Sequence, residues 1–411
     1  MRKPVLRRGR TIWLGRTAPA TRYPTLRGHH DTEVAIVGGG MTGAMIAEAF
    51  TRIGVSVAVI EAGRIGHGST AANTALLLQE PDYDLGSLSD KYGAATARRI
   101  WQLSSNAARD FVKTIRRLKI DCDLRERDSL YYTLDHDKAT ELQRELRRRR
   151  AAGLGGSWLT PRALERISGI RGGGAIRTRG NAQLNPLAAC SGLIRAAARN
   201  GARVFERSNV HRIAQVDDGV RLYSRAGTVD ALQVVIATGY ATKYFRPLAG
   251  RFRMRHTYVL STNKAGWIAR RRLGLGDVML WDTARPYHYV RWTDDHRLLL
   301  GGADHPVKPG ARHDKQFADA TQKLRDYFES LYPTLADVGI ETAWEGLFAM
   351  TPDSLPYIGP HRRYPKHAFA LGYGGNGMTF AALAARILVE RWQGIRSKDH
   401  ELFAFNRFGS N

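Results

Sequence analysis

The chain has 411 residues, enough for two domains of ordinary size, and 63 Lys and Arg against 38 Asp and Glu give it a formal net charge of +25. No apolar run reaches the ~20 residues that a membrane span requires, so no transmembrane segment is predicted. The positive charge would attract anions, nucleic acid among them. However, the arginines are spread along the chain without a nucleic-acid-binding motif, which favours a basic, solvated surface without excluding that partner. Nothing in the sequence sets the oligomeric state.

The two cysteines, Cys122 and Cys190, have no CxxC neighbour and no nearby histidine pair, so we predict no metal site. Two lone cysteines in a chain of this size are typical of a reducing compartment, which favours the cytoplasm. Residues 1–30 form a basic N-terminal extension, and no apolar segment of a secretory signal follows it. The aromatic stretch Trp13 to Tyr23 is expected to lie along the folded body.

A glycine motif near the start carries the first chemical signal. The stretch Glu33 to Gly43 predicts a buried strand, a glycine turn and the start of a helix. Gly38 would make the tight turn, Gly40 would let a pyrophosphate approach the backbone, and Gly43 would let the helix pack close to the strand. The helix would direct its N-terminal amides and the positive end of its dipole at the phosphates.

The elements after these glycines complete a dinucleotide-binding pattern. A helix over Ala44 to Ile53 and a strand over Val55 to Ile60 are predicted, and the strand ends at Glu61, where an acid would hold a ribose hydroxyl. The small residues of Gly63 to Ala75 offer hydroxyls and open amides that suit a diphosphate and the edge of a planar ring. A turn and a loop without a nucleotide are the alternatives, and the motif alone does not separate FAD from NAD.

The middle of the chain alternates predicted helices and strands. Residues 90–150 carry apolar side chains at helical spacing and are predicted to be helical, and Arg171 to Gly180 is predicted to be a connection. Pro186 to Arg199 predicts a helix, and Val234 to Gly239 a buried strand and turn. Four short alternating strands between Arg253 and Gly301 predict a second, antiparallel sheet.

The last part of the chain contains a second glycine loop. After the segment Trp344 to Gly359, a strand over His367 to Leu371 leads into the run Gly372 to Thr379, which opens a helix over Phe380 to Trp392. The loop would again lie at a helix N-terminus, as at the first motif.

With these motifs in place, the chain resembles the D-amino-acid oxidase-like FAD-dependent oxidoreductases from about Trp13 to Phe408. The markers are Gly38-x-Gly40-x-x-Gly43, Glu61, Gly68-Ser69-Thr70, Ala237-Thr238-Gly239, Thr351-Pro352-Asp353-x-Leu355-Pro356-x-Ile358-Gly359 and Gly372-Tyr373-Gly374-Gly375-Asn376-Gly377. Together they specify the superfamily and not a substrate. The resemblance implies an α/β fold: a Rossmann-like FAD-binding domain of the glutathione-reductase type with an inserted α+β substrate domain built on an antiparallel sheet. The FAD domain would comprise residues 31–85, 175–250 and 344–411, and the substrate domain residues 86–174 and 251–343.

The resemblance also implies which residues contact FAD. They are Gly38, Gly40, Met41, Thr42, Gly43, Glu61, Ala62, Ser69, Thr70, Asn73, Val210, Ala237, Thr238, Gly239, Gly374, Gly375, Asn376, Gly377, Met378 and Thr379. In the last six, loop amides and a helix N-terminus would stabilise the negative charge that reduction places near the flavin C2 carbonyl. Relatives that bind flavin covalently use a cysteine or a histidine at positions where this chain has none, which favours non-covalent FAD.

The implied reaction is oxidation of a C–N bond in an amine or amino-acid derivative, with hydride transfer to flavin N5 and hydrolysis of the imine by water. Dioxygen or another acceptor would take the electrons. Leu299 falls where sarcosine-type enzymes carry an oxygen-activating lysine, which favours a dehydrogenase. The alternatives are a flavin-dependent tRNA-modifying enzyme and a flavin-binding protein without amine turnover.

The substrate is the least determined part of this prediction. Phe348 stands where amino-acid oxidases of this type carry an arginine that clamps the substrate carboxylate, and phenylalanine cannot make that contact. A larger or less anionic amine is therefore favoured over a simple α-amino acid. Tyr289, Arg291, Tyr373 and His256 are the other candidate pocket residues, with core packing or a structural role as the alternative for each.

Overall fold

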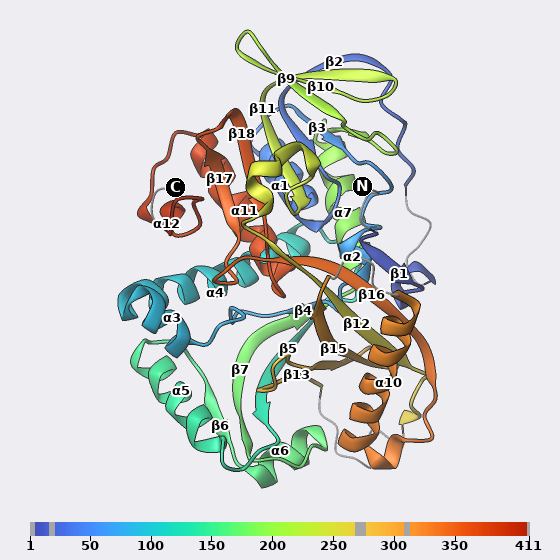
Figure 1. Cartoon of the computed structure of the whole chain (residues 1–411), viewed down its shortest axis with the longest axis vertical. Helices are drawn as coiled ribbons and strands as arrows, with labels where there is room; N and C mark the ends of the chain where they lie inside the picture. The colour runs from blue at the N-terminus through green and yellow to red at the C-terminus, as the bar shows by residue number, and fades with distance from the viewer. Residues whose placement is uncertain (1–4, 16–20, 268–276, 308–312, 409–411) are drawn as a thin grey trace.

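The computed structural model describes residues 5–15, 21–267, 277–307 and 313–408 (Figure 1). It contains two large mixed sheets, one in the upper and one in the lower part of the view in Figure 1. This arrangement confirms the predicted α/β class, with a Rossmann-like sheet and a second, mainly antiparallel sheet. None of the described helices combines the length and the apolar character needed to cross a membrane.

The first sheet has the strand order β17-β18-β11-β2-β3-β8, and its five strands from β18 to β8 are parallel. Its strands are near-continuous apolar runs because helices cover one face and a hairpin with loops covers the other. The elements are β2 (Gly28–Val37), β3 (Val57–Ile60), β8 (Arg203–Phe205), β9 (Arg212–Val216), β10 (Gly219–Tyr223), β11 (Gly227–Gly239), β17 (Tyr357–His361), β18 (Tyr364–Leu371), α1 (Met41–Arg52), α7 (Pro186–Arg199), α11 (Gly377–Trp392), α8 (Arg246–Ala249) and α12 (Lys398–Glu401).

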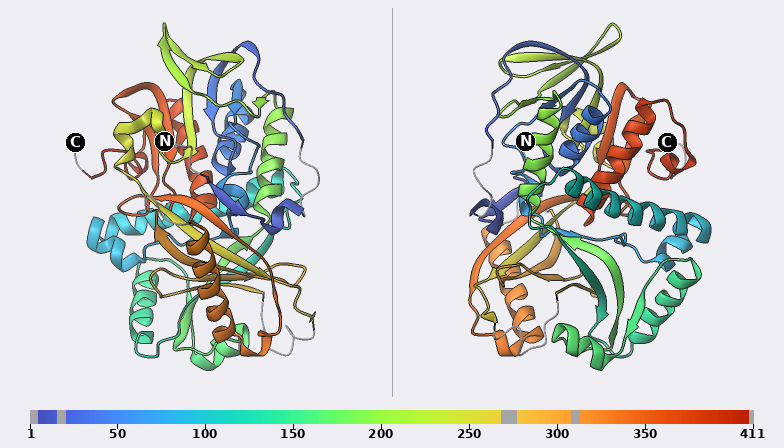
Figure 2. Two further views of the ribbon diagram at one scale, coloured as in Figure 1. Left: turned by 45° about the vertical axis from the view of Figure 1, so that its right-hand side comes forward. Right: turned by 180° about the vertical axis from the view of Figure 1, so that it is seen from behind.

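The second sheet has the strand order β1-β16-β12-β15-β14-β13-β5-β7-β4, with β6 beside β7. All its described pairs are antiparallel except β13 with β5. Helices α6 and α10 pack on its outer face (Figure 2). The elements are β1 (Arg7–Gly9), β4 (Leu76–Leu77), β5 (Arg125–Thr133), β6 (Ser157–Leu159), β7 (Gly174–Gln183), β12 (Arg253–Thr262), β13 (Val278–Asp282), β14 (Tyr289–Trp292), β15 (Leu298–Pro306), β16 (Ile340–Met350), α2 (Ser69–Ala72), α3 (Leu85–Tyr92), α4 (Ala94–Arg117), α5 (Ala139–Ala151), α6 (Pro161–Ser168) and α10 (His313–Leu331).

The helical prediction for residues 90–150 is wrong over β5. Lys119 and Asp123 adopt positive φ angles of 51° and 52° and end the helical course. The following Tyr131 and Tyr132 are buried in the sheet between β7 and β13. Likewise β7 occupies most of the stretch 171–180 that was predicted to be a connection. Both strands are specified by their sheet partners, which lie far away in the sequence.

The N-terminal extension is part of the second sheet. Strand β1 pairs with β16, and the Leu347 amide donates to the Leu6 carbonyl at 2.9 Å. Trp13 is buried, and its indole donates to the Asn73 carbonyl at 2.9 Å. The expectation that this stretch lies along the folded body is therefore confirmed up to Gly15, while residues 16–20 lie outside the described ranges.

Helix α4 links the two parts of the molecule. Its apolar side chains, Phe111 among them, belong to the same buried cluster as those of α1 and α11. Figure 1 shows α4 crossing between the two sheets. The space between the sheets, beside this helix, is where the candidate site lies.

Candidate active site

The two glycine loops follow β2 and β18, at the carboxyl ends of parallel strands of the first sheet, with β11 between them. The amide of Gly372, after β18, donates to the carbonyl of Gly239, the last residue of β11, at 3.0 Å. The turn after β2 begins at Gly38, whose φ of 115° is reserved for glycine. Ligands of open α/β sheets bind at this edge.

Close packing explains why the first motif needs its glycines. A Cβ at Gly43 would lie 1.9 Å from the Gly38 carbonyl oxygen, and a Cβ at Gly38 would lie 2.6 Å from that of Ala237. Helix α1 is thereby held directly against the turn. Its N-cap residue is Gly40, which has no side chain to cap the helix. The Met41 amide donates to Thr70 Oγ1 at 2.9 Å, which joins the turn to the small-residue loop.

Glu61 lies beside the same turn. Its carboxylate accepts from the amides of Gly39 and Gly63, each at 2.7 Å. At the second loop, helix α11 begins at Gly377 without a side-chain cap from Asn376. Two helix N-termini that receive no side-chain cap from their own N-cap residues, and an acid after the second strand, fit the phosphates, the ribose and the reducible ring of FAD. The residues present therefore fit this cofactor.

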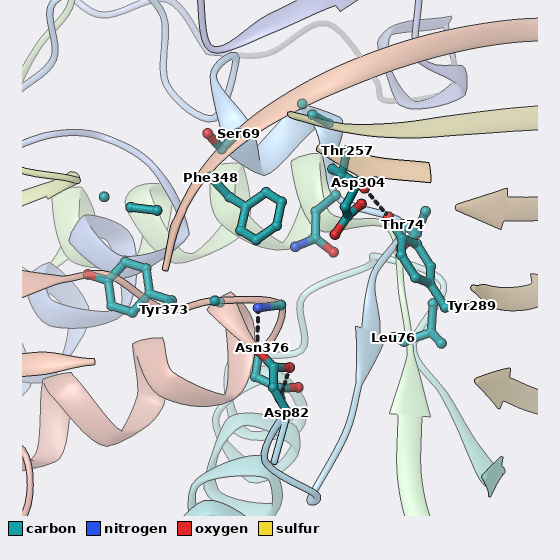
Figure 3. Close-up of a pocket in the computed structure, with 18 of the residues that line it drawn as sticks. Ser69, Thr74, Leu76, Asp82, Thr257, Tyr289, Asp304, Phe348, Tyr373 and Asn376 are labelled. Carbon is teal, nitrogen blue, oxygen red and sulfur yellow. Dashed lines mark hydrogen bonds between the residues drawn. The ribbon is translucent and has the colours of Figure 1, made fainter. Parts of the chain in front are cut away.

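A cavity of about 1210 Å³, including the part open to solvent, separates the loops from the second sheet (Figure 3). Phe348, Tyr289 and Tyr373 line it, as do several predicted cofactor residues: Ser69, Asn73, Thr238, Gly239, Gly374, Gly375, Asn376 and Gly377. The remaining predicted cofactor residues lie outside its lining: Gly38, Gly40, Met41, Thr42, Gly43, Glu61, Ala62, Thr70, Val210, Ala237, Met378 and Thr379. Most of these belong to the first turn, α1 and α11, which extend from the cavity along the first sheet.

Two of the predicted pocket residues do not reach the cavity. His256 precedes the lining residue Thr257 on β12, and alternation turns its side chain to the opposite face, beside His305 and His313. Burial there lowers the pKa of His256 to about 4. Arg291 is also buried, and it donates to the carbonyls of Ala75 and Leu184 at 2.9 and 3.1 Å. Arg291 was predicted to line the substrate pocket, but it is not among the residues that line the cavity, and it holds two backbone carbonyls in place.

The cavity has an acidic part that the sequence analysis missed. Glu80, Asp82 and Asp304 line it, together with Trp281 and Tyr287. Burial raises the pKa of Asp82 and of Asp304 to about 6 each. The only sequence signal is an acid four positions after a run of leucines: Asp304 follows Leu298 to Leu300, and Asp82 follows Leu76 to Leu78.

The Thr351-Pro352-Asp353 segment is held by a buried ion pair. Arg407 donates to both oxygens of Asp353 at 2.8 Å, and Tyr92 donates to the same carboxylate at 2.5 Å. The Arg407 side chain keeps the pKa of Asp353 below its usual range despite burial. The guanidinium also lies 4.0 Å from the centre of the Tyr357 ring. Asp353 is therefore an anchor for the loop that carries the site and does not line the cavity.

Several other residues with reactive or aromatic side chains serve to pack the core. Cys122 and Cys190 are buried free thiols, and burial raises the pKa of both. Tyr258 and Trp344 are fully buried in the core. Leu299 is buried in one cluster with Trp13 and Trp344.

Comparisons with known proteins agree with this geometry. The sequence profile of the DAO family, described as FAD dependent oxidoreductase, matches residues 33–391. Gamma-glutamylputrescine oxidoreductase of Escherichia coli (strain K12) is 29% identical over 375 residues, 90% of this chain and 86% of that protein. Glycine oxidase of Bacillus licheniformis is 26% identical over 398 residues, 92% and 97% of the two chains. The crystal structure of glycine oxidase from Geobacillus kaustophilus superposes with a TM-score of 0.75 at 22% identity, covering 93% of this chain and 99% of that one.

Proposed function

We propose that this chain, which belongs to the DAO family of FAD-dependent oxidoreductases, oxidises the C–N bond of an amine that carries no α-carboxylate. The observation that carries the proposal is the lining of the cavity. Among its described residues there is no Lys, Arg or His, so no cationic side chain there can clamp a substrate carboxylate. The relative named gamma-glutamylputrescine oxidoreductase is, by that name, an enzyme for an amine derivative, which supports the same class.

The residues of the two loops would hold FAD non-covalently, with no cysteine or histidine lining the described cavity. When bound, FAD would accept a hydride at N5 from the substrate carbon next to the nitrogen, and the nitrogen lone pair would form the C=N bond of an imine. Water would then hydrolyse the imine to a carbonyl compound and a free amine or ammonia. The amides of Gly377 to Thr379, at the start of α11, would stabilise the negative charge that this creates, because those of Gly374, Gly375 and Asn376 already donate to Ala349, Asp82 and Tyr373. The electrons would then pass to dioxygen or to another acceptor.

The second sheet supplies the other side of the pocket. Phe348 and Tyr289 present apolar rings to the cavity, and Tyr289 Oη is bonded to Thr257 Oγ1 at 2.9 Å, which fixes its ring. These walls would exclude water and orient the amine for hydride transfer. The reaction is proposed to take place in the cytoplasm, because both cysteines are free thiols.

An RNA substrate is disfavoured by the same lining. Three carboxylates face the cavity, and they would repel the phosphates of a polyanion despite the net charge of +25.

The test is anaerobic reduction of the purified protein. It should be yellow, release FAD and not FMN on acid treatment, and lose its visible absorbance when an amine is added. A colourless protein that takes up no FAD, or a yellow one that no amine in a panel of primary, secondary and polyamines bleaches, would overturn the proposal. Slow reoxidation of the reduced flavin by air would support the prediction, made from Leu299, that the enzyme is a dehydrogenase.

A further inference from the structure

The three carboxylates of the cavity differ in how the protein accommodates them. Glu80 is buried, and it accepts from Ser129 Oγ at 3.0 Å and from Asn181 Nδ2 at 3.1 Å. Asp82 accepts from the Gly375 amide at 2.8 Å and from Asn376 Nδ2 at 2.9 Å. Protein groups therefore satisfy both oxygens of each of these two acids. They need no ligand to explain their burial.

Asp304 is accommodated less completely. Its Oδ1 is buried and has no hydrogen-bond partner among the described residues. Arg255 donates to the backbone carbonyl of Asp304, at 3.1 Å, and forms no described ion pair with the carboxylate. Burial raises the pKa of this carboxyl, and the Thr257 side chain acts in the opposite direction. A buried carboxylate oxygen without a partner is unfavourable unless a ligand supplies a donor, and the cavity is the side from which one can arrive.

Aromatic rings surround this part of the cavity. The ring centres of Trp281 and Tyr287 lie 6.4 Å apart, and those of Tyr287 and Tyr289 lie 5.9 Å apart, so the three rings form one wall. Figure 3 shows Asp304 beside Thr257 and Tyr289, while Asp82 lies on the other side with Asn376. Aromatic faces next to a carboxylate are the surroundings in which proteins bind alkylammonium groups.

We propose that Asp304 binds a second cationic group of the substrate, so that the enzyme prefers diamines, or amines with another ammonium group, to monoamines. This proposal rests on the proposed function, because it concerns the substrate of the same cavity. A chain with a net charge of +25 repels dications in general. Local carboxylates are therefore needed if a doubly charged amine is to enter.

The reacting nitrogen is a less suitable partner for Asp304. Hydride transfer requires that nitrogen to be neutral, whereas a carboxylate stabilises the protonated form. A group that stays charged throughout the reaction is held with equal strength before and during hydride transfer. Such an interaction changes KM more than kcat, which separates it from a role of Asp304 as the base that deprotonates the amine.

The experiment compares putrescine with butylamine, which has the same carbon chain and lacks the second ammonium group. With the holoenzyme, we expect the rate constant for anaerobic flavin reduction, divided by the apparent Kd, to be at least about tenfold higher for putrescine. In Asp304→Asn, this ratio should fall through Kd to about that of butylamine, so that the enzyme no longer distinguishes the two amines. Asp319→Asn, on an exposed position of α10, removes the same charge elsewhere and is the control.

Each other outcome contradicts the proposal. If Asp304→Asn lowered the maximal rate of flavin reduction equally for both amines and shifted the pH profile of that rate, Asp304 would be the base that deprotonates the amine. An unchanged putrescine preference in a variant that keeps its FAD would show that Asp304 does not bind the second cation. In both cases amines still reduce the flavin and the proposed function stands, whereas failure of every amine with wild-type enzyme would overturn that function as well. FAD absorbance and thermal midpoint verify that the variant folds.

Discussion

The two sides of the cavity recognise their ligands by different means. On the side of β2, β11 and α11, backbone amides and close glycine contacts form the binding surface, and side chains are kept away from it. On the side of β12, β14 and β15, side chains form it: a carboxylate, hydroxyls and aromatic rings from separate strands. The first surface suits a cofactor shared by a whole family. The second can change its specificity by single substitutions.

The largest predicted effect concerns the loop on the cofactor side. Arg407→Ala would leave the fully buried carboxylate of Asp353 without its charge partner, which destabilises a protein by about 3–5 kcal/mol. We expect a lower midpoint in urea and weaker FAD retention. The control is Arg221→Ala, which breaks an equally bidentate but much less buried pair with Asp230 and should leave the midpoint nearly unchanged. Equal effects of the two variants would contradict the anchoring role of Asp353.

The glycine packing is tested next. Gly43→Ala would place a Cβ 1.9 Å from the Gly38 carbonyl and force α1 away from the turn. FAD binding should weaken at least about tenfold, with a destabilisation of about 1–3 kcal/mol. Equilibrium dialysis against FAD measures the first and denaturant unfolding the second. Gly250→Ala, at a position where an added Cβ meets nothing within 4 Å, should change neither.

Much of the cofactor side could be predicted from the sequence. Recognition by backbone amides requires glycines at fixed spacing within one segment. The stretch from Gly38 to Glu61, which contains the turn, α1 and β3, is such a segment. Helix α7 has the predicted bounds Pro186–Arg199 because Asn185 caps it and proline begins it. The substrate side could not be predicted in this way. Asp82 and Asp304 are more than two hundred positions apart, and only the pairing of the sheet and the loops brings both to one cavity.

The two misplaced residues have different causes. The face that His256 occupies depends on the register of β12 with its neighbours. Arg291 shares a face of β14 with Tyr289, but it lies two residues further along the strand, where the carbonyls of Ala75 and Leu184 hold its guanidinium. An alternating strand with both faces buried does not reveal which face meets the cavity. Tyr289, two positions from Arg291 on the same strand, lines the cavity as predicted.

A charge placed on the substrate side should alter its specificity. Phe348→Arg would introduce a cation among the cavity carboxylates and lower kcat/KM for putrescine at least about tenfold by like-charge repulsion. Phe348→Leu, which keeps an apolar wall, should retain most of the activity. If leucine were as harmful as arginine, the aromatic ring of Phe348, and not the charge of the pocket, would decide the specificity.

The smallest predicted effect is on stability. Burial raises the pKa of Asp304 from 3.8 to about 6, although Arg255, His288 and His305 act in the opposite direction. A raised folded-state pKa opposes folding above about pH 6 and has no such effect below about pH 4. Asp304→Asn should therefore raise the thermal midpoint of the holoenzyme by about 2 °C near pH 8, and not near pH 4. An equal rise in the thermal midpoint at pH 8 and pH 4 would contradict the electrostatic cause. The control variant Asp319→Asn should not raise the midpoint at either pH.

The most direct test of the central claim is anaerobic titration of the wild-type holoenzyme with putrescine, butylamine and glycine. The visible flavin absorbance should be lost at the lowest concentration of putrescine, at higher butylamine, and hardly at all with glycine, because an acidic cavity without a basic lining residue favours cations over carboxylates. Reduction by glycine at lower concentrations than by putrescine would contradict the account of the substrate side.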